Sequence, residues 1–150
     1  MAKMIDEKPS FKGEGKVWNK LSEYLPSDMV VYNQREINGR EYDFCVMAEN
    51  LGIVVIEVKG WLAERIIVNG VDNIDVEGYE KPQTSPKKQA RAYRFAILNK
   101  ISEKYNVSPL VLDMVCYPFI SKAEYESSRL DIVSEEQYTI FKEDLEDCER

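Results

Sequence analysis

The sequence contains no histidine, and this absence removes several classes of enzyme at once. Hydrolases whose serine or cysteine is activated by an imidazole are excluded, as are zinc sites built on histidine. A histidine general base is excluded as well. Any catalysis by this chain must therefore come from carboxylates, lysine, hydroxyl groups or a bound metal ion.

Cysteine is scarce, and the three residues present, Cys45, Cys116 and Cys148, lie far apart. Their spacing fits no metal-binding motif, so we expect reduced cysteines in a cytoplasmic protein. Long apolar runs are also missing. No apolar segment approaches the roughly 18 residues of a membrane span, and the chain does not open with a charged segment followed by an apolar one. Neither secretion nor membrane insertion is predicted.

The net charge of −7 is unevenly distributed along the 150 residues, 44% of which are hydrophobic, enough for the core of one domain. Acids and bases balance up to Ala123, and the excess of acid lies from Glu124 onward. Residues 81–100 contain six bases and no acid. Such a run is either a solvated helix face or a surface that binds phosphates. The candidate nucleic-acid-binding residues within it are Lys87, Lys88, Arg91 and Arg94.

The most informative segment is residues 41–61, which we interpret as two strands joined by a short turn. Apolar and polar residues alternate over residues 42–47, as in a strand. Residues 53–58 are mostly apolar and branched, which indicates a strand buried on both faces. This strand ends in Glu57-Val58-Lys59. An acid and a lysine there are costly unless they are paired, bound to a metal or wetted by a cleft.

The length of the turn decides whether an acidic pair forms. A three-residue turn at residues 49–51 places Asp43 directly opposite Glu57, with Cβ atoms about 4.5–5.5 Å apart. Two carboxylates that close repel each other, and a divalent cation between them relieves the repulsion. A two-residue turn would put the acids on opposite faces. The alternatives are a structural ion pair of Glu57 with Lys59, and an edge acid at Asp43 paired with Arg40 or Lys59.

The remaining pattern alternates helices and strands. Ser10 is the predicted N-cap of a helix that runs to about Leu25, with Glu14 on its apolar side as a helix-dipole partner or a site acid. Residues 1–9 are expected to be loosely held. The other expected elements are a strand at Met29–Ile37, an Asn38-Gly39 turn, a small hairpin within residues 61–80, a helix at Pro86–Tyr105, a strand at Leu110–Phe119, short strands at Leu130–Val133 and Tyr138–Phe141, and a helix starting after Lys142.

Four short motifs follow one another over residues 13–90. They are Gly13-Glu14-Gly15, GREYDF at residues 39–44, GIVVIEVKGW at residues 52–61, and SPKKQA at residues 85–90. Together they resemble the nuclease-related domain, NERD, of the PD-(D/E)XK nuclease superfamily. In that family an Asp on one strand precedes Glu-x-Lys on the next, and Gly-Glu and Pro-x-x-Gln-Ala open two helices. Tyr42 stands where the family usually has proline.

The resemblance implies an α/β, restriction-endonuclease-like fold, with a helix, three strands, a helix and a strand around a mixed central sheet flanked by helices. The catalytic residues implied are Asp43, Glu57, Lys59 and Gln89. The metal ligands implied are Glu14, Asp43, Glu57 and the backbone carbonyl of Val58. Oxygen donors of this kind suit Mg²⁺ or Mn²⁺.

The predicted function is therefore metal-dependent hydrolysis of phosphodiester bonds, with DNA favoured over RNA. The resemblance also implies that a helicase module follows in a longer chain, with residues 142–150 as the linker. Two alternatives keep the fold without cleavage. One is a nucleic-acid-binding module, and the other is an assembly domain that uses the acidic segment from Glu124 onward to bind a basic partner.

Overall fold

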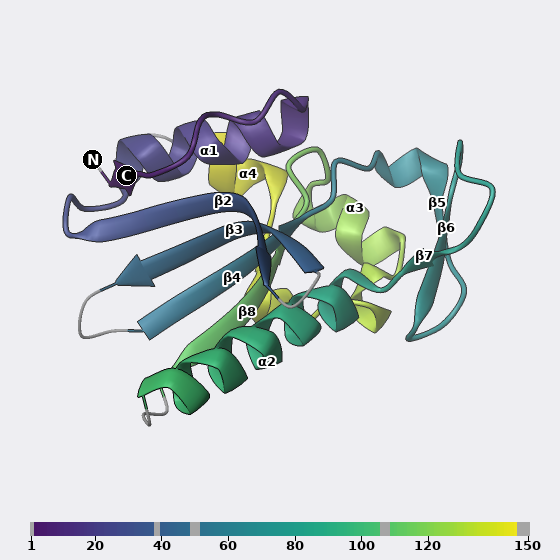
Figure 1. Ribbon diagram of the computed structural model, residues 1–150. Helices are drawn as coiled ribbons and strands as arrows, with labels where there is room; N and C mark the ends of the chain where they lie inside the picture. Colours follow the sequence, from purple (N-terminus) through teal and green to yellow (C-terminus); the bar gives the residue numbers. More distant parts are fainter. Residues whose placement is uncertain (1, 38–39, 49–51, 106–108, 147–150) are drawn as a thin grey trace.

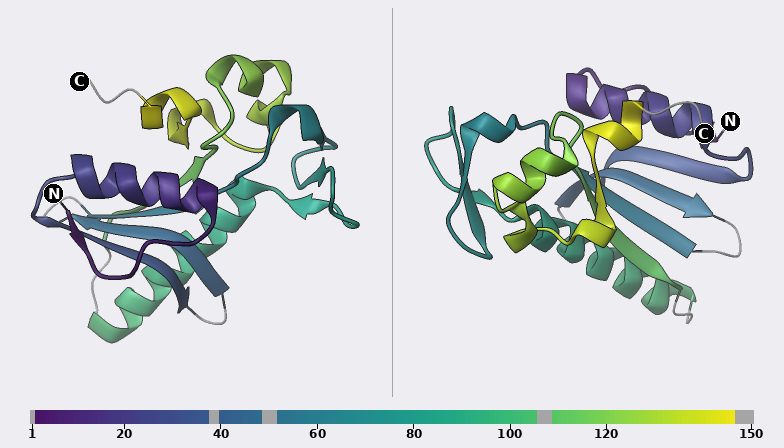
Figure 2. Two further views of the ribbon diagram at one scale, coloured as in Figure 1. Left: turned by 90° about the horizontal axis from the view of Figure 1, so that it is seen from above. Right: turned by 180° about the vertical axis from the view of Figure 1, so that it is seen from behind.

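The computed structural model describes residues 2–37, 40–48, 52–105 and 109–146, and it has a central six-stranded sheet between two helices (Figure 1). Helix α1 (Lys12–Tyr24) covers one face and helix α2 (Pro86–Tyr105) the other (Figure 2). The strand order is β1-β2-β3-β4-β8-β9. The strands are β1 (Lys3–Met4), β2 (Met29–Ile37), β3 (Arg40–Ala48), β4 (Gly52–Val58), β8 (Val111–Cys116) and β9 (Thr139–Ile140).

The sheet is mixed, as predicted. The pairs β2–β3 and β3–β4 are antiparallel, whereas β1–β2, β4–β8 and β8–β9 are parallel. Parallel neighbours need a crossover, and α2 lies in the connection between β4 and β8. The predicted order of a helix, three strands, a helix and a strand is therefore confirmed, and it brings the end of β4 to the middle of the sheet.

Strand β4 is buried on both faces because each side chain row packs against a different helix. Ile56 lies in the core that includes Val17 of α1, and Val55 lies in the core that includes Ile97 of α2. The apolar stripe predicted on α2 is part of the second core, through Tyr93, Ile97 and Ile101. A strand in this position can end in charged residues only where the two helical layers leave an opening.

A second, three-stranded sheet lies between β4 and α2 in the chain and to one side of the central sheet in Figure 1. Its strands are β5 (Ile66–Val68), β6 (Asn73–Val76) and β7 (Gln83–Thr84), and the 3₁₀ turn η1 (Ala63–Arg65) precedes them in the chain. The predicted hairpin is confirmed, with β7 as an additional strand. Ile74 and Val76 pack in one core with Trp61 and Tyr117, so the small sheet is anchored beside the end of β4.

The C-terminal region corrects one prediction. It contains α3 (Lys122–Ser127), η2 (Leu130–Ile132), η3 (Glu136–Tyr138), β9 and α4 (Lys142–Glu146). The short strand predicted at Leu130–Val133 is wrong, because this segment forms a 3₁₀ turn. Leu130 and Val133 are both buried, and a spacing of three residues puts them on one side of a helical turn but on opposite faces of a strand. The short strand and the helix predicted after it are confirmed.

The N-terminal segment corrects two further predictions. Residues 3 and 4 are not loosely held, since they pair in parallel with Val30 and Val31. The Asp6 carboxylate accepts hydrogen bonds from the Arg35 side chain and the Asn33 amide. Ser10 is not the N-cap of α1, because the cap residue is Phe11, which makes no side-chain capping bond. The first turn of α1 is therefore held by tertiary contacts.

Cys45 and Cys116 are buried free thiols, as expected for reduced core cysteines. Burial raises the pKa of both, to about 12 for Cys45, so neither is a reactive thiolate at neutral pH. Cys148 lies outside the described residues. In the part of the chain that the structure describes, no helix combines the length and the apolar composition needed to span a bilayer.

Candidate active site

The β3–β4 ladder has the register on which the acidic pair depends. Cys45 pairs with Val55 and Met47 with Ile53, and the last printed pair is Phe44 with Ile56. One further step along the same register places Asp43 opposite Glu57. The turn at residues 49–51 lies outside the described residues, but Ala48 pairs with Gly52 as a three-residue connection requires. The predicted register is confirmed.

Asp43 lies where the side chains of β3 stop alternating regularly between the two faces of the sheet. Phe44 packs in the core beneath α1, whereas Tyr42, two residues away, packs in the core beneath α2. On the neighbouring strand, the pairs on either side place Gln34 opposite Asp43, and Gln34 has a left-handed φ of 53°. An unusual backbone angle of this kind persists only where the surroundings enforce it. The irregularity therefore coincides with the position of the first site acid.

Glu57 and Lys59 form an ion pair at the end of β4. The Lys59 Nζ lies 3.3 Å from Oε1 of Glu57, and their side chains are only 16% and 7% exposed. The same ammonium lies 5.6 Å from the centroid of the Trp61 ring, and the Lys59 amide donates to the carbonyl of Cys116 at 2.9 Å. These contacts fix the lysine beside the acid, as the sequence pattern predicts.

The ion pair leaves one acid oxygen unsatisfied. Oε2 of Glu57 is buried and receives no hydrogen bond from a donor group of the described residues, although the carboxyl of Asp43 lies close enough to share a proton with Glu57. Burial raises the pKa of Glu57 well above its ordinary value, and the nearby Asp43 carboxylate raises it further. Burial also raises the pKa of Asp43, against the lowering effect of the hydrogen bond from the Val58 amide. Two close, buried carboxylates repel each other when both are ionised, and either a shared proton or a divalent cation relieves that repulsion.

The first turn of α1 approaches the end of β4 closely because Gly13 has no side chain. A Cβ at Gly13 would lie 3.2 Å from Cγ of Pro118 and 3.5 Å from Cα of Gly60. The first distance is tighter than ordinary van der Waals contact, so a methyl group here requires a small shift of its neighbours, whereas the second is an ordinary contact. Gly13 thus sets the position of Glu14, the next residue on the helix.

Glu14 lies close enough to Asp43 for their charges to interact, and its role as a metal ligand stays a prediction. The side-chain amide of Gln34 donates to Oε2 of Glu14 at 3.2 Å. The pKa of Glu14 is raised chiefly by burial and next by the carboxylate of Asp43, with a smaller contribution from Glu41. The negative charges of Asp43 and Glu41 thus both favour the protonated form of Glu14.

The candidate ligands for a metal ion are the carboxylates around the end of β4. In the described ranges, no three His, Cys, Asp or Glu side chains gather closely enough to hold a metal ion, so the structure does not bring Glu14, Asp43 and Glu57 together as one ligand group. The available donors are hard oxygens with one buried, unpartnered carboxylate oxygen, and they match Mg²⁺ or Mn²⁺, which retain several waters as ligands. The residues therefore fit a hydrated divalent ion, and the Val58 carbonyl as a ligand stays a prediction.

An open cleft of about 440 Å³ is lined by Glu14, Val58 and Lys59, whereas Asp43 and Glu57 are not among its lining residues. It extends from the start of α1 across the end of β4 to the segment between β6 and β7. Gln89, a predicted catalytic residue, is not among the residues that line it. The Oε1 atom of Gln89 is buried without a hydrogen-bond partner among the described residues. Its predicted role remains a prediction.

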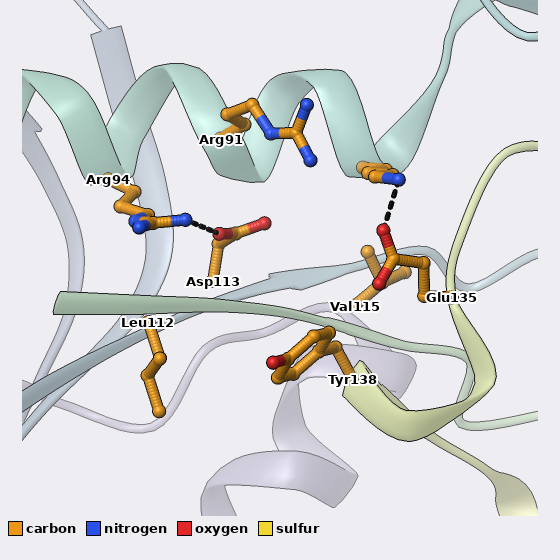
Figure 3. A pocket seen from close by; sticks show the side chains of 8 residues that line it. Arg91, Arg94, Leu112, Asp113, Val115, Glu135 and Tyr138 are labelled. Carbon is orange, nitrogen blue, oxygen red and sulfur yellow. Dashed lines mark hydrogen bonds and ion pairs between the residues drawn. The ribbon is translucent and has the colours of Figure 1, made fainter.

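The basic residues of α2 lie elsewhere, and an acid lies close to Lys87, Lys88 and Arg94 in turn. Lys87 pairs with Glu135, and Arg94 pairs with Asp113 at 3.2 Å, with Arg91 between them on the helix (Figure 3). These three residues line a separate pocket of about 140 Å³ between α2 and β8. Lys88 lies 3.6 Å from Asp72, and both of these side chains are exposed. The structure thus does not bring the four predicted nucleic-acid-binding residues to the cleft.

Two polar residues near the site, Gln34 and Glu41, were not predicted from the sequence. The sequence does contain a signal for Gln34. A two-residue turn at Asn38-Gly39 pairs Ile37 with Arg40, and the same register pairs Gln34 with Asp43. The pairing of Ile37 with Arg40 is observed, although residues 38 and 39 themselves lie outside the described part. The left-handed backbone of Gln34 had no signal, since glutamine does not favour it.

The fold is thus a mixed α/β domain in which central strand β4 ends in Glu57 and Lys59, with the acid Asp43 on the neighbouring strand β3. The chain belongs to the nuclease-related domain family, NERD, whose sequence model matches residues 9–118. A repair endonuclease from Pyrococcus abyssi, solved by crystallography, is similar in structure, with 14% sequence identity and a TM-score of 0.44. The similarity covers 90% of this chain and 48% of that one, so this chain spans about half its length. The comparison with curated proteins found no match.

Proposed function

We propose that this domain is a divalent-metal-dependent nuclease that hydrolyses phosphodiester bonds, with DNA as the expected substrate. The observation that carries the proposal is the buried pair of Asp43 and Glu57, with an unpartnered carboxylate oxygen and Lys59 only 3.3 Å from Glu57. A structural ion pair needs one acid for one lysine, and here a second acid is held beside it. Membership of the nuclease-related domain family supports the same assignment.

Asp43 and Glu57 would hold Mg²⁺ or Mn²⁺, with Glu14 and the Val58 carbonyl as further candidates. Such an ion neutralises charge on the scissile phosphate and lowers the pKa of a bound water. Because the pKa of Glu57 is raised in the metal-free protein, Glu57 must lose a proton before it can act as a ligand. Metal affinity is therefore expected to rise with pH.

Lys59 would stabilise the negative charge that develops on the phosphate. Its ammonium is fixed by Glu57 and by the face of Trp61, and it lines the open cleft. A donor whose position is fixed before the reaction requires no reorganisation when charge develops. Lys59 is accordingly the residue whose loss should reduce the rate most directly without a loss of folding.

The test is a cleavage assay on single-stranded, duplex and flap DNA with Mg²⁺, Mn²⁺ or EDTA. Wild type is compared with Lys59→Met and Asp43→Asn, and Lys81→Met serves as an exposed lysine control outside the cleft. We expect metal-dependent cleavage that falls by at least about 100-fold in both site variants and is unchanged in the control. Cleavage that survives in EDTA or in Lys59→Met would contradict the proposal, and binding without cleavage would identify a nucleic-acid-binding module.

A further inference from the structure

The cleft that contains Lys59 and Glu14 also has exposed aromatic walls. Phe11 and Tyr79 both line it, and their exposed fractions are 70% and 57%. They come from separate elements, since Phe11 directly precedes α1 and Tyr79 lies between β6 and β7. Two large rings that line one cleft and remain open to water indicate a binding surface for flat, apolar groups.

Both rings are attached to fixed backbone. The start of α1 is held by the close contacts of Gly13, and the Tyr79 amide donates to the carbonyl of Val76 at 3.1 Å. Val76 lies in the same core as Trp61, below the cleft. In Figures 1 and 2 the N-terminal end of α1 points toward the side on which the small sheet lies. The rings are therefore presented at low conformational cost.

We propose that this cleft takes unpaired nucleotides, so that the substrate is a single strand or a single-stranded branch, with Phe11 and Tyr79 stacking on bases next to the scissile phosphate. This inference rests on the proposed function. Bases in a duplex already stack on each other and cannot present a free face to a protein ring. Unpaired bases can, and each base stacked on an aromatic side chain contributes about 1–3 kcal/mol.

The charges around the cleft favour the same substrate. Lys12 and Lys59 line it and can contact the phosphates of one strand. Duplex binding relies on many cations spread over phosphates of both strands. On α2, by contrast, Lys87 is paired with Glu135 and Arg94 with Asp113, and both bases line a different pocket. The small sheet, which carries Tyr79, would thus determine which strand enters the site.

The test measures binding in EDTA, where metal-dependent cleavage does not interfere. Fluorescence anisotropy is recorded with a labelled oligothymidylate of about 15 nucleotides and with a hairpin duplex of similar length. The variants are Phe11→Leu, Tyr79→Leu and the double variant. The control is Phe95→Leu, which changes a 49% exposed ring on α2 that does not line the cleft.

We expect wild type to bind the single strand more tightly than the duplex. Each cleft substitution should weaken single-strand binding by about fivefold or more and leave duplex binding and the Phe95→Leu control unchanged. Unchanged single-strand affinity in both cleft variants, a preference for duplex, or no binding by wild type would overturn the inference. If the cleft variants lose binding but wild type does not cleave with Mg²⁺, only the proposed catalysis fails. If wild type cleaves and the variants behave normally, only this inference fails.

Discussion

The amide of Val58 donates a hydrogen bond to Oδ2 of Asp43 at 2.7 Å, across from β4 to β3. It extends the contact between the two strands beyond the last regular pair, Phe44 with Ile56. One oxygen of Asp43 is thus bound by the strand that carries Glu57 and Lys59, and the carboxylate retains its other oxygen for a further partner. The hairpin itself therefore orients the acid.

Without metal, the protein should become less stable as the pH rises. The pKa values of Asp43 and Glu57 are raised in the folded state, mainly by burial, so the folded protein holds protons that the unfolded chain releases. The free energy of unfolding then falls with increasing pH, from about pH 4 upward through the folded pKa values. Urea midpoints in EDTA between about pH 5 and 9 measure this slope.

Glu57→Gln is the matched variant for that experiment. It removes the titrating group but keeps the side chain's shape, so we expect a flatter profile and greater stability than wild type at the alkaline end. The control is Glu77→Gln, an exposed residue directly after β6, whose stability should vary with pH as in wild type. Identical slopes in wild type and Glu57→Gln would show that the acidic pair does not hold a proton in the folded state.

Mg²⁺ should stabilise wild type and fail to stabilise Asp43→Asn or Glu57→Gln. Binding only to the folded state adds about 2.7 kcal/mol at a hundredfold excess over Kd, or roughly 5–10 °C in Tm for a chain of this size. The increase should be larger at pH 8 than at pH 6, because the acids must lose protons to bind the ion. Thermal melts with Mg²⁺ and with EDTA measure it, and an equal shift in Glu57→Gln would exclude this residue as a ligand.

Gly13→Ala should reduce cleavage more than it reduces stability. The new methyl group would lie 3.2 Å from Cγ of Pro118, and we expect a small shift of the first turn of α1, with Glu14, to relieve this contact. Alanine is favoured over glycine within a helix by about 1 kcal/mol, which offsets part of the strain. We expect a stability within about 1–2 kcal/mol of wild type and a loss of cleavage of at least about tenfold.

Gly70→Ala is the control for that substitution, because a Cβ at Gly70 has no atom within 4 Å. It should change neither Tm nor the cleavage rate by more than a small amount. Full activity in Gly13→Ala would mean that the position of Glu14 does not matter for the reaction.

Gln89→Leu should raise Tm and lower cleavage. Its Oε1 is buried without a partner among the described residues, and an unsatisfied buried polar atom costs about 1–3 kcal/mol. Leucine removes that cost but also removes the amide, to which the family pattern assigns a role in catalysis. Melts and single-turnover cleavage measure the two effects, with exposed Gln137→Leu as the control. Unchanged cleavage would remove Gln89 from the catalytic group.

The parts of the site that could be predicted are local in the sequence. Turn length and alternation fix the partners within a hairpin, so the register of Asp43 against Glu57 followed from a short segment. The partners of Arg94 and Lys87 did not, because Asp113 and Glu135 approach α2 only when β8 and the C-terminal turns pack against it. The pairing of β1 with β2 involves two residues and has no periodic signal. Sequence reasoning thus found the acids and overestimated the free basic charge.

The β3–β4 hairpin joins residues that are close together in the sequence, and this affects the order in which the chain folds. Ala48 and Gly52 meet across a very short connection, whereas β8 must wait for the whole of α2 to fold across the sheet. Short-range contacts form first in folding. The two anions of the site are therefore forced together while the chain is still largely open to solvent, and the speed of that early step should increase in acid or with added divalent salt.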